Sequence, residues 1–291
     1  MVRVGIYGYE CTEEVVLNGY RIVPLYKNNI DVKRLSKDES CYHLTAFLVI
    51  ENDDKMRIDS FIFDLEAVLS FVSQKDVLIR NPLRDREDYF CLDDDFPMKL
   101  EGDRRTNRDR IIIGDYICKE STRNYIDLAM KALSGESNEA IVFRKALFKV
   151  IEVFKARKHF IDVSYYLLFS ALESLCRHIK DDFGNNCALP INLVLQNYGF
   201  DVYQDLPNKP HQSIMTYVHL RNALFHNGMM EKEVKTPTGD TVVYRQSEYY
   251  STFSGLLPLV LLRYIGFDDD YINWNSWLDR QPFEFRVKKY C

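Results

Sequence analysis

Three side chains in the second half of the chain have the types that phosphate chemistry needs: Arg221, Asn222 and His226. The planar guanidinium group of arginine donates two parallel hydrogen bonds to two oxygens of one phosphate. Histidine suits proton transfer near neutral pH because the ordinary pKa of its imidazole is about 6.5. Asn222 precedes His226 by four residues, so on a helix its amide could orient the imidazole or hold a phosphate oxygen. We therefore predict a site that binds phosphate and moves protons.

The segment 217–228 is predicted to form the last turns of a helix that begins near Pro210. It ends in Asn227-Gly228, and both residues tolerate the left-handed conformation that often closes a helix. At about 100° per residue, the apolar face holds Ile214, Tyr217, Leu220 and Leu224, and the polar face holds Asn222, His226 and His219. Arg221 falls at the margin of the apolar arc. An unpaired charge is costly there, so we expect an acidic partner or a phosphate.

Two further residues are candidates for a supporting role at this site. Glu173 lies among apolar residues of a predicted helix, and it either faces solvent or forms a salt bridge with Arg221. His219 is expected either on the surface or in contact with a second copy of the chain. His226 itself has a simpler alternative, a helix-terminal histidine that the helix dipole stabilises.

The stretch Arg221-Asn222-Ala223-Leu224-Phe225-His226 resembles the motif of the HEPN superfamily. In that motif an arginine, a polar residue and, a few positions later, a histidine lie near a helix end in a small helical bundle. The resemblance covers at most the C-terminal half, and a β-rich region ahead of the helices is similar in layout to the ApeA-type HEPN proteins of bacterial antiphage defence. Many catalytic members are metal-independent ribonucleases. The resemblance therefore implies that Arg221, Asn222 and His226 are catalytic, with Glu173 and His219 in support.

RNA carries its own nucleophile, the 2′-hydroxyl, so a nuclease that uses it needs no metal and no cofactor. Such an enzyme must help to remove the 2′-hydroxyl proton, stabilise charge at phosphorus and help the 5′ oxygen to leave. One motif supplies one histidine, and the resembled family places two motifs across one cleft. The resemblance thus implies a symmetric homodimer, an RNA substrate, and products that end in a 2′,3′-cyclic phosphate and a 5′-hydroxyl.

The length of 291 residues allows two domains, and the residue pattern changes near residue 118. We predict an α+β chain, with a β-rich domain over 1–117 and an all-α, HEPN-like bundle with a β-hairpin insertion over 118–291. The first domain is acidic and lacks a catalytic constellation, so we expect it to sense or regulate, with a phage-derived molecule or a protein as its trigger. Strands are predicted over 20–26, 42–50 and 56–63, a hairpin over 231–244, and helices over 64–73, 120–133, 138–158, 160–180 and 249–265, from Pro190 and from Pro210.

Charge and cysteine usage narrow the class of protein. Residues 1–133 hold 20 basic and 25 acidic residues, which accounts for the whole net charge of −5 and argues against indiscriminate coating of nucleic acid. The seven cysteines show no Cys-x-x-Cys pair and no nearby histidine at ligand spacing, so we expect reduced thiols and neither disulfides nor a structural zinc. Long apolar segments are missing as well, which predicts a cytoplasmic protein without membrane attachment.

Two charged loops have alternative interpretations, and two other functions compete with that of a ribonuclease. Asp93-Asp94-Asp95 is expected to be a solvated turn, although a metal-dependent hydrolase could use it. A cluster of four arginines either lies in a solvated loop or contacts phosphate: Arg104, Arg105, Arg108 and Arg110. The main alternative to a ribonuclease is a non-catalytic, dimeric binding module with the same helical bundle, in which the first domain acts as the sensor.

Overall fold

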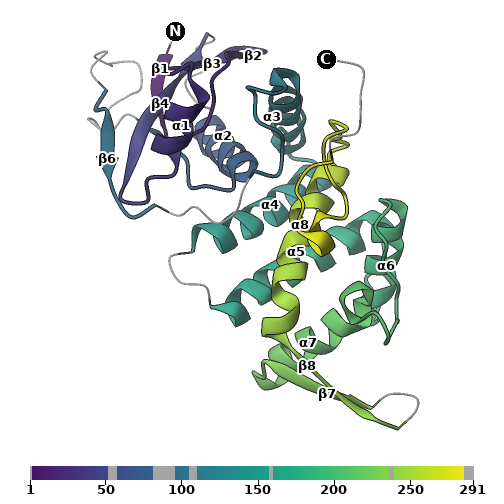
Figure 1. Cartoon of the computed structure of the whole chain (residues 1–291). Helices are drawn as coiled ribbons and strands as arrows, with labels where there is room; N and C mark the ends of the chain where they lie inside the picture. The colour runs from purple at the N-terminus through teal and green to yellow at the C-terminus, as the bar shows by residue number, and fades with distance from the viewer. Residues whose placement is uncertain are drawn as a thin grey trace. The chain divides into compact units, whose positions relative to one another are not determined.

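The computed structural model describes residues 2–51, 58–80, 96–104, 110–156, 160–235 and 239–284 (Figure 1). Within them the chain is α+β, as predicted, with an antiparallel sheet, a separate β-hairpin and helices. The chain divides into two compact units. Unit 1 comprises Met1–Ser134, Asp269–Ile272 and Phe285–Cys291, and unit 2 comprises Gly135–Asp268 and Asn273–Glu284.

Unit 1 is built on a six-stranded sheet with the strand order β2-β3-β4-β1-β5 and with β6 paired to β4. The strands are β1 (Val2–Tyr7), β2 (Val15–Leu17), β3 (Tyr20–Pro24), β4 (Cys41–Ile50), β5 (Leu78–Arg80) and β6 (Lys99–Glu101). β4 is the longest strand, and it pairs with β1, β3 and β6, so its register fixes most of the sheet. Both β3 and β4 are rich in β-branched and aromatic residues, which explains why these two predicted strands form.

The described part of unit 1 also contains the helices α1 (Asn29–Ser36), α2 (Ile58–Ser73) and α3 (Lys119–Leu133). The residue pattern did not predict α1, whose first turn is capped by the side chain of Asn28. The strand predicted over 56–63 is wrong, because α2 already begins at Ile58. Ile58 and Ile62, which precede residue 64, are buried and continue the helical spacing of the buried Leu65 and Leu69.

A buried ion pair lies inside unit 1. The Lys75 ammonium donates a hydrogen bond to the Glu10 carboxylate at 2.7 Å and another to the Ser36 hydroxyl at 2.9 Å. The side chains of Lys75 and Glu10 are only 6% and 8% exposed. Because an unpaired charge at such a depth is strongly unfavourable, each residue depends on the other.

Two arginines of the predicted charged loop are buried as well. The Arg104 guanidinium is 2% exposed and donates to three backbone carbonyls, those of Gly8, Ser36 and Asp76. Arg110 donates to the backbone carbonyl of Glu10 at 2.8 Å. Neither a solvated loop nor a contact with an external phosphate describes these two residues, because both are buried and donate to internal carbonyls. Arg105 and Arg108 lie outside the described residues.

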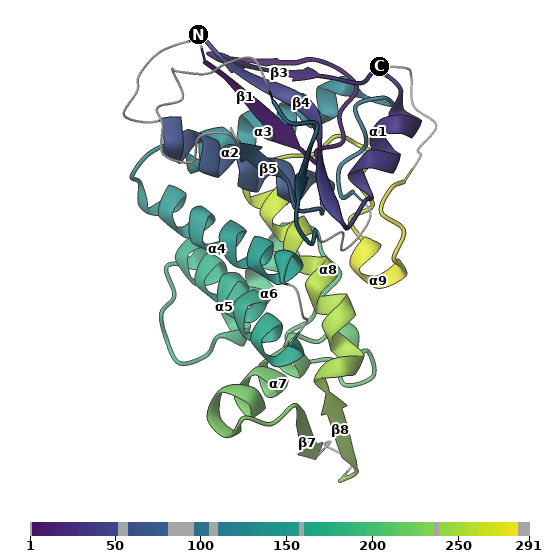
Figure 2. The ribbon, with the colours of Figure 1, turned by 90° about the vertical axis from the view of Figure 1, so that its left-hand side faces the viewer.

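Unit 2 is a bundle of helices with a hairpin between α7 and α8 (Figure 2). Its helices are α4 (Asn138–Lys155), α5 (Ile161–Lys180), α6 (Ala188–Asn197), α7 (Ile214–Asn227), α8 (Gln246–Tyr264) and the short α9 (Ser276–Asp279). The hairpin is formed by β7 (Glu231–Lys235) and β8 (Thr241–Arg245). α5 packs against α4, α6, α7 and α8, so it is the central helix of the unit. The helix predicted from Pro210 begins as a 3₁₀ turn over Pro210–Gln212, which α7 follows.

Aromatic side chains fill the centre of unit 2 and fix α7 against α5. The rings of Tyr165 and Tyr217 each lie 5.0 Å from the ring of Phe253, measured between centroids. The Tyr165 hydroxyl donates a hydrogen bond to the backbone carbonyl of Tyr217 at 2.9 Å. This contact lies one helical turn ahead of Arg221, so the residues of the predicted motif belong to a well-packed helix.

The most apolar stretch of the chain, 255–262, lies in α8, and its residues from 256 to 262 are buried in unit 2. Pro258 is accommodated inside this helix. Among the helices that the structure describes, none is long and apolar enough to cross a membrane.

The division between the units falls after Ser134, whereas the residue pattern predicted it after residue 117. α3 accounts for the difference, because it packs against α2 and β2 of unit 1. The rings of Phe71 on α2 and Tyr125 on α3 are stacked with centroids 5.8 Å apart. A change from strand to helix along the chain therefore does not mark the division here.

Candidate functional site

The last two turns of α7 position Arg221, Asn222 and His226. The helix ends at the residue before Gly228, which has a φ of 65°, the left-handed conformation that glycine adopts without strain. The Gly228 amide donates to the backbone carbonyl of Leu224 at 2.9 Å. The predicted glycine cap is present, and it places His226 in the final helical turn.

Glu173 of α5 binds two guanidinium groups at once. Arg221 Nη2 lies 3.4 Å from Glu173 Oε2, and Arg177 Nε lies 2.9 Å from Glu173 Oε1. Of the two alternatives for Glu173, the salt bridge with Arg221 is therefore the one observed. The side chains of Arg221, Glu173 and Arg177 are 23%, 15% and 14% exposed, so solvent reaches all three. Arg177 also donates to the backbone carbonyls of Asp182 and Gly184, which anchors it.

The Arg221 guanidinium is held in place but incompletely bonded. Its Nη1 donates to the side-chain oxygen of Asn222 at 2.9 Å, and its Cζ lies 4.6 Å from the centroid of the Phe225 ring. Its Nε is buried and has no hydrogen-bond partner among the described residues. Nε is buried beyond the reach of an added ligand, but each terminal nitrogen carries two N–H groups and the side chain is 23% exposed, so an acceptor such as a phosphate could bind there.

His226 is exposed, in contrast to the arginine five residues before it. Asn222 presents its side-chain oxygen to Arg221, so in this structure the amide supports the guanidinium and not the imidazole. The site therefore combines an oriented cation with an imidazole that is open to solvent.

His219 lies apart from this cluster, against the hairpin. Its ring is nearly parallel to the ring of Tyr244 on β8, with an interplanar angle of 13° and centroids 6.5 Å apart. Burial lowers the pKa of His219, with a smaller opposing contribution from Asp205. The structure thus brings Arg221, Asn222 and Glu173 together but gives His219 a packing contact within its own chain.

The cluster at the end of α7 favours an anion. Arg177 and Arg221 contribute two positive charges and Glu173 contributes one negative charge, which leaves a net charge of +1. The C-terminal end of a helix by itself disfavours anions, so the arginines must supply the attraction. His226 follows Arg221 by five residues, so it lies about 140° around the helix and about 7.5 Å further along its axis. The arginine cluster and the imidazole are therefore close neighbours along α7 but do not share one helix face.

Exposed apolar side chains border the cluster on α5. Tyr166 is 50% exposed, and its ring centroid lies 4.6 Å from that of Phe225, the ring beneath Arg221. Phe160 and Val163 are exposed at three-residue intervals ahead of Tyr166 and so lie on the same side of the helix. Aromatic rings of this kind can stack with nucleic-acid bases or pack against a second protein chain.

Two features of the molecule were missed from the sequence. Arg177 follows Glu173 by four residues, a spacing that predicts an ion pair on a helix and could have shown it. The expectation that no histidine lies near a cysteine at ligand spacing is wrong. Asp38, Cys41 and His43 place one ligand atom each within 4.8 Å of one another, and the pattern Asp-x-x-Cys-x-His was the signal. The predicted Asp93–Asp95 turn lies outside the described residues.

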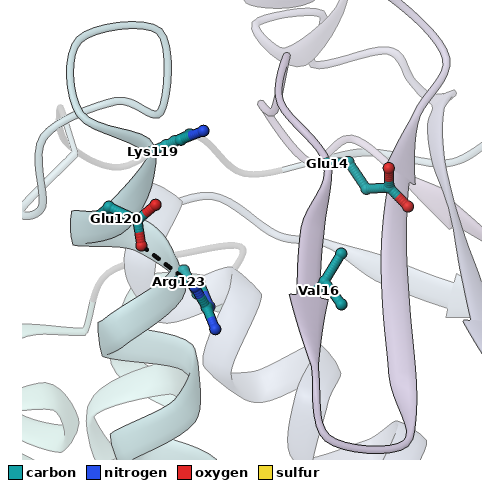
Figure 3. A pocket seen from close by; sticks show the side chains of 5 residues that line it. All are labelled: Glu14, Val16, Lys119, Glu120 and Arg123. Carbon is teal, nitrogen blue, oxygen red and sulfur yellow. Dashed lines mark hydrogen bonds and ion pairs between the residues drawn. The ribbon is translucent and has the colours of Figure 1, made fainter.

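A pocket in unit 1 is a weaker candidate because its charges cancel. Figure 3 shows its lining, which consists of Lys119, Glu120 and Arg123 of α3 with Glu14 and Val16 at β2. Arg123 and Glu120 form an ion pair with an N–O distance of 3.4 Å. Two acidic and two basic side chains leave no net charge to select an anionic or cationic ligand.

Comparisons of the chain with models of protein families, with curated proteins and with solved structures find no match. Any statement about function therefore depends on the geometry at the end of α7 and on the resemblance of its six-residue motif.

Proposed function

We propose that the chain is a metal-independent endoribonuclease whose site lies at the end of α7. The observation that carries the proposal is the state of Arg221, which Glu173 and Phe225 orient while its side chain stays 23% exposed. Exposed His226 follows on the same helix, in the final turn. The resemblance to the HEPN motif supplies the reaction class, the cleavage of RNA.

In the proposed reaction the 2′-hydroxyl of RNA attacks the adjacent phosphorus, and the 5′ oxygen leaves. Arg221 binds the non-bridging phosphate oxygens and stabilises the negative charge that grows on them. His226 takes a proton from the 2′-hydroxyl or gives one to the 5′ oxygen. The products end in a 2′,3′-cyclic phosphate and a 5′-hydroxyl, without a covalent enzyme intermediate.

The proposed reaction moves two protons, and each chain supplies one His226, so we propose a symmetric homodimer in which two motifs face one cleft. Val163 and Tyr166 on α5, with Phe160 at its N-cap, form an exposed apolar surface that reaches Arg221 through the ring of Phe225. A second copy that covered this surface would bury apolar area and bring the two motifs close together.

Unit 1 is proposed to sense a phage-derived molecule or a protein and to regulate the ribonuclease in the cytoplasm, in antiphage defence or as a toxin. This role is supported by the resemblance in layout, a sheet-containing region ahead of the helices. Unit 1 buries Lys75, Glu10 and Arg104 within its own interior, where they are unavailable to a substrate.

A non-catalytic binding module is the second candidate. Tyr166, Phe225 and Arg221 form a surface of aromatic rings and positive charge that could dock a protein or a nucleotide without chemistry. The two candidates differ over His226, which only the ribonuclease requires for turnover.

Cleavage of bulk cellular RNA by the purified full-length chain, with EDTA present, separates the two candidates. His226→Ala is expected to lower the cleavage rate by a factor of about 10² to 10⁴, the typical contribution of an acid–base group. His178→Ala is the matched control, because His178 also lies in the last turn of a helix of unit 2, and it should cleave like the parent. Thermal melting checks that both variants fold. Equal cleavage by parent and folded His226→Ala would refute the ribonuclease and favour the binding module.

A further inference from the structure

A second group of side chains with chemistry of its own lies at the start of β4 in unit 1. Asp38 lies in the turn after α1, and Cys41 and His43 are two residues apart on β4, so their side chains leave the same face of the strand. His43 Nε2 lies 2.8 Å from Asp38 Oδ2. Cys41 Sγ lies 3.4 Å from the same oxygen and 3.3 Å from His43 Nε2. An oxygen, a sulfur and a nitrogen thus form a closed triangle.

We propose that this triangle is a binding site for a divalent transition-metal ion of the zinc class, with three protein ligands and a fourth position open to solvent. Tetrahedral zinc has Zn–S bonds of about 2.3 Å and Zn–N and Zn–O bonds of about 2.0–2.2 Å, so its donor atoms lie roughly 3.4–3.6 Å apart. The two separations from sulfur, 3.4 and 3.3 Å, fall at or just below that spacing, whereas the separation of 2.8 Å between nitrogen and oxygen is a hydrogen-bond distance that the ion would have to lengthen. Rotation of exposed side-chain ends by a few tenths of an ångström would admit the ion.

The carboxylate of Asp38 is already oriented for this role. The backbone amide and the hydroxyl of Ser40 both donate to Asp38 Oδ1, at 2.9 and 2.6 Å. Oδ2 is therefore the oxygen left to face Cys41 and His43. Hydrogen bonds that fix the direction of a ligand in this way are a regular part of metal sites.

The chemical types of the three ligands select the kind of metal. Thiolate and imidazole favour Zn²⁺ and Co²⁺ over Mg²⁺ and Ca²⁺, which prefer oxygen ligands alone. On binding, the Cys41 thiol forms a metal–sulfur bond and releases its proton to solvent, while His43 binds as the neutral imidazole. A divalent ion with one thiolate and one carboxylate leaves no net charge on the three-ligand complex.

Access is consistent with an ion that exchanges with solvent, whereas the buried Arg104 guanidinium places one positive charge near Asp38 and Cys41. Cys41 is buried, whereas the side chains of His43 and Asp38 are 22% and 35% exposed. The cross-strand neighbours on β6 are Glu101, opposite Cys41, and Lys99, opposite His43. Their opposite charges offset each other. A bound metal would join the turn after α1 to the central strand of the sheet and would stabilise unit 1.

Titration of the metal-free full-length chain with Co²⁺, followed by displacement with Zn²⁺, tests the site. We expect one Co²⁺ per chain, with a thiolate-to-cobalt charge-transfer band and the visible bands of four-coordinate cobalt. Cys41→Ser and His43→Gln should each weaken binding by about 100-fold or more, since the loss of even an outer partner typically costs 10–100-fold. Cys118→Ser, which alters another buried cysteine of unit 1, should bind like the parent.

X-ray absorption of the zinc-loaded parent gives an answer that does not depend on any variant. One sulfur at about 2.3 Å from zinc, with nitrogen and oxygen as the other ligands, is expected. Absence of stoichiometric binding, an unchanged cobalt spectrum in folded Cys41→Ser, or a zinc shell without sulfur would overturn the proposal. None of these outcomes bears on RNA cleavage in EDTA. The failure of the metal-site proposal can therefore be distinguished from the failure of the ribonuclease proposal.

Discussion

Two ion pairs, one in each unit, lie in different surroundings. In unit 1, Lys75 and Glu10 lie 2.7 Å apart, are 6% and 8% exposed, and share a further hydrogen bond with Ser36. In unit 2, Arg221 and Glu173 lie 3.4 Å apart, are 23% and 15% exposed, and leave Arg221 Nε without a partner among the described residues. We call Lys75–Glu10 the closed pair, because it is buried, and Arg221–Glu173 the open pair, because it is partly exposed and incompletely bonded. The closed pair stabilises one conformation, whereas the open pair can accept a ligand. Exposure and incomplete bonding therefore distinguish the Arg221–Glu173 pair from the Lys75–Glu10 pair.

The largest expected effect is on the closed pair. Glu10→Gln would leave the Lys75 ammonium buried without a carboxylate, and loss of one partner of a buried pair typically costs about 3–5 kcal/mol. Urea unfolding should show this loss in the free energy of unfolding. Glu14→Gln is the matched control, because Glu14 pairs with Arg21 on the surface and exposed pairs contribute about 1 kcal/mol or less. Equal effects of the two changes would remove the contrast between closed and open pairs.

Arg221→Ala should act on the open pair in the opposite way, with a large effect on rate and a small one on stability. Removal of one donor that stabilises transition-state charge typically lowers the rate by about 10²–10³-fold. The fold should persist, because Glu173 keeps its bond to Arg177. RNA cleavage and thermal melting measure the two effects. Arg263→Ala, which removes an arginine paired with Asp268 in the same unit, should not lower the cleavage rate.

Arg221→Lys sharpens the comparison at a smaller scale. An ammonium keeps the charge but cannot reproduce the bidentate fork or the stacking on Phe225. We expect a rate between those of the parent and Arg221→Ala, about tenfold below the parent, which corresponds to about 1.4 kcal/mol. A rate equal to that of the parent would show that charge alone suffices at this position.

The smallest expected effect concerns His219, which lies outside the open pair. Burial lowers its pKa, so the folded state favours the neutral imidazole. The stability that His219 contributes is therefore present above its ordinary pKa of about 6.5 and is lost as pH falls below that value. His219→Gln should lose less stability than the parent between pH 7.5 and pH 5.5 in urea unfolding. His211, whose pKa burial also lowers, stays in both proteins and cancels in the comparison. A steeper loss in the variant would contradict the assignment.

Local patterns in the sequence predicted the helix of the motif well. The apolar spacing of Ile214, Tyr217 and Leu220 and the glycine at residue 228 are interactions within one helix, so they can be recognised without the rest of the fold. The acidic partner of Arg221 was also predictable, because a charge at the margin of a buried face requires one. The resemblance to a family, by contrast, stays a hypothesis about chemistry.

Contacts between distant segments were beyond the reach of such patterns. Nothing near His219 in the sequence shows that Tyr244 of the hairpin stacks on it. The burial of Arg104 depends on carbonyls of three separate segments, so a run of charged residues gave a misleading expectation of exposure. The α1 helix was missed because its apolar face is short, with Val32 as its one buried apolar side chain.

The central claim is that RNA is cleaved at the α7 motif by its own 2′-hydroxyl. Its most direct test is end-group analysis of a defined RNA after incubation with the full-length chain in EDTA, beside the same RNA with every 2′-hydroxyl methylated. We predict 2′,3′-cyclic phosphate and 5′-hydroxyl ends from the natural RNA and no cleavage of the methylated RNA. With His226→Ala, neither kind of end should form. Cleavage of the methylated RNA, or products with 5′-phosphate ends, would contradict it.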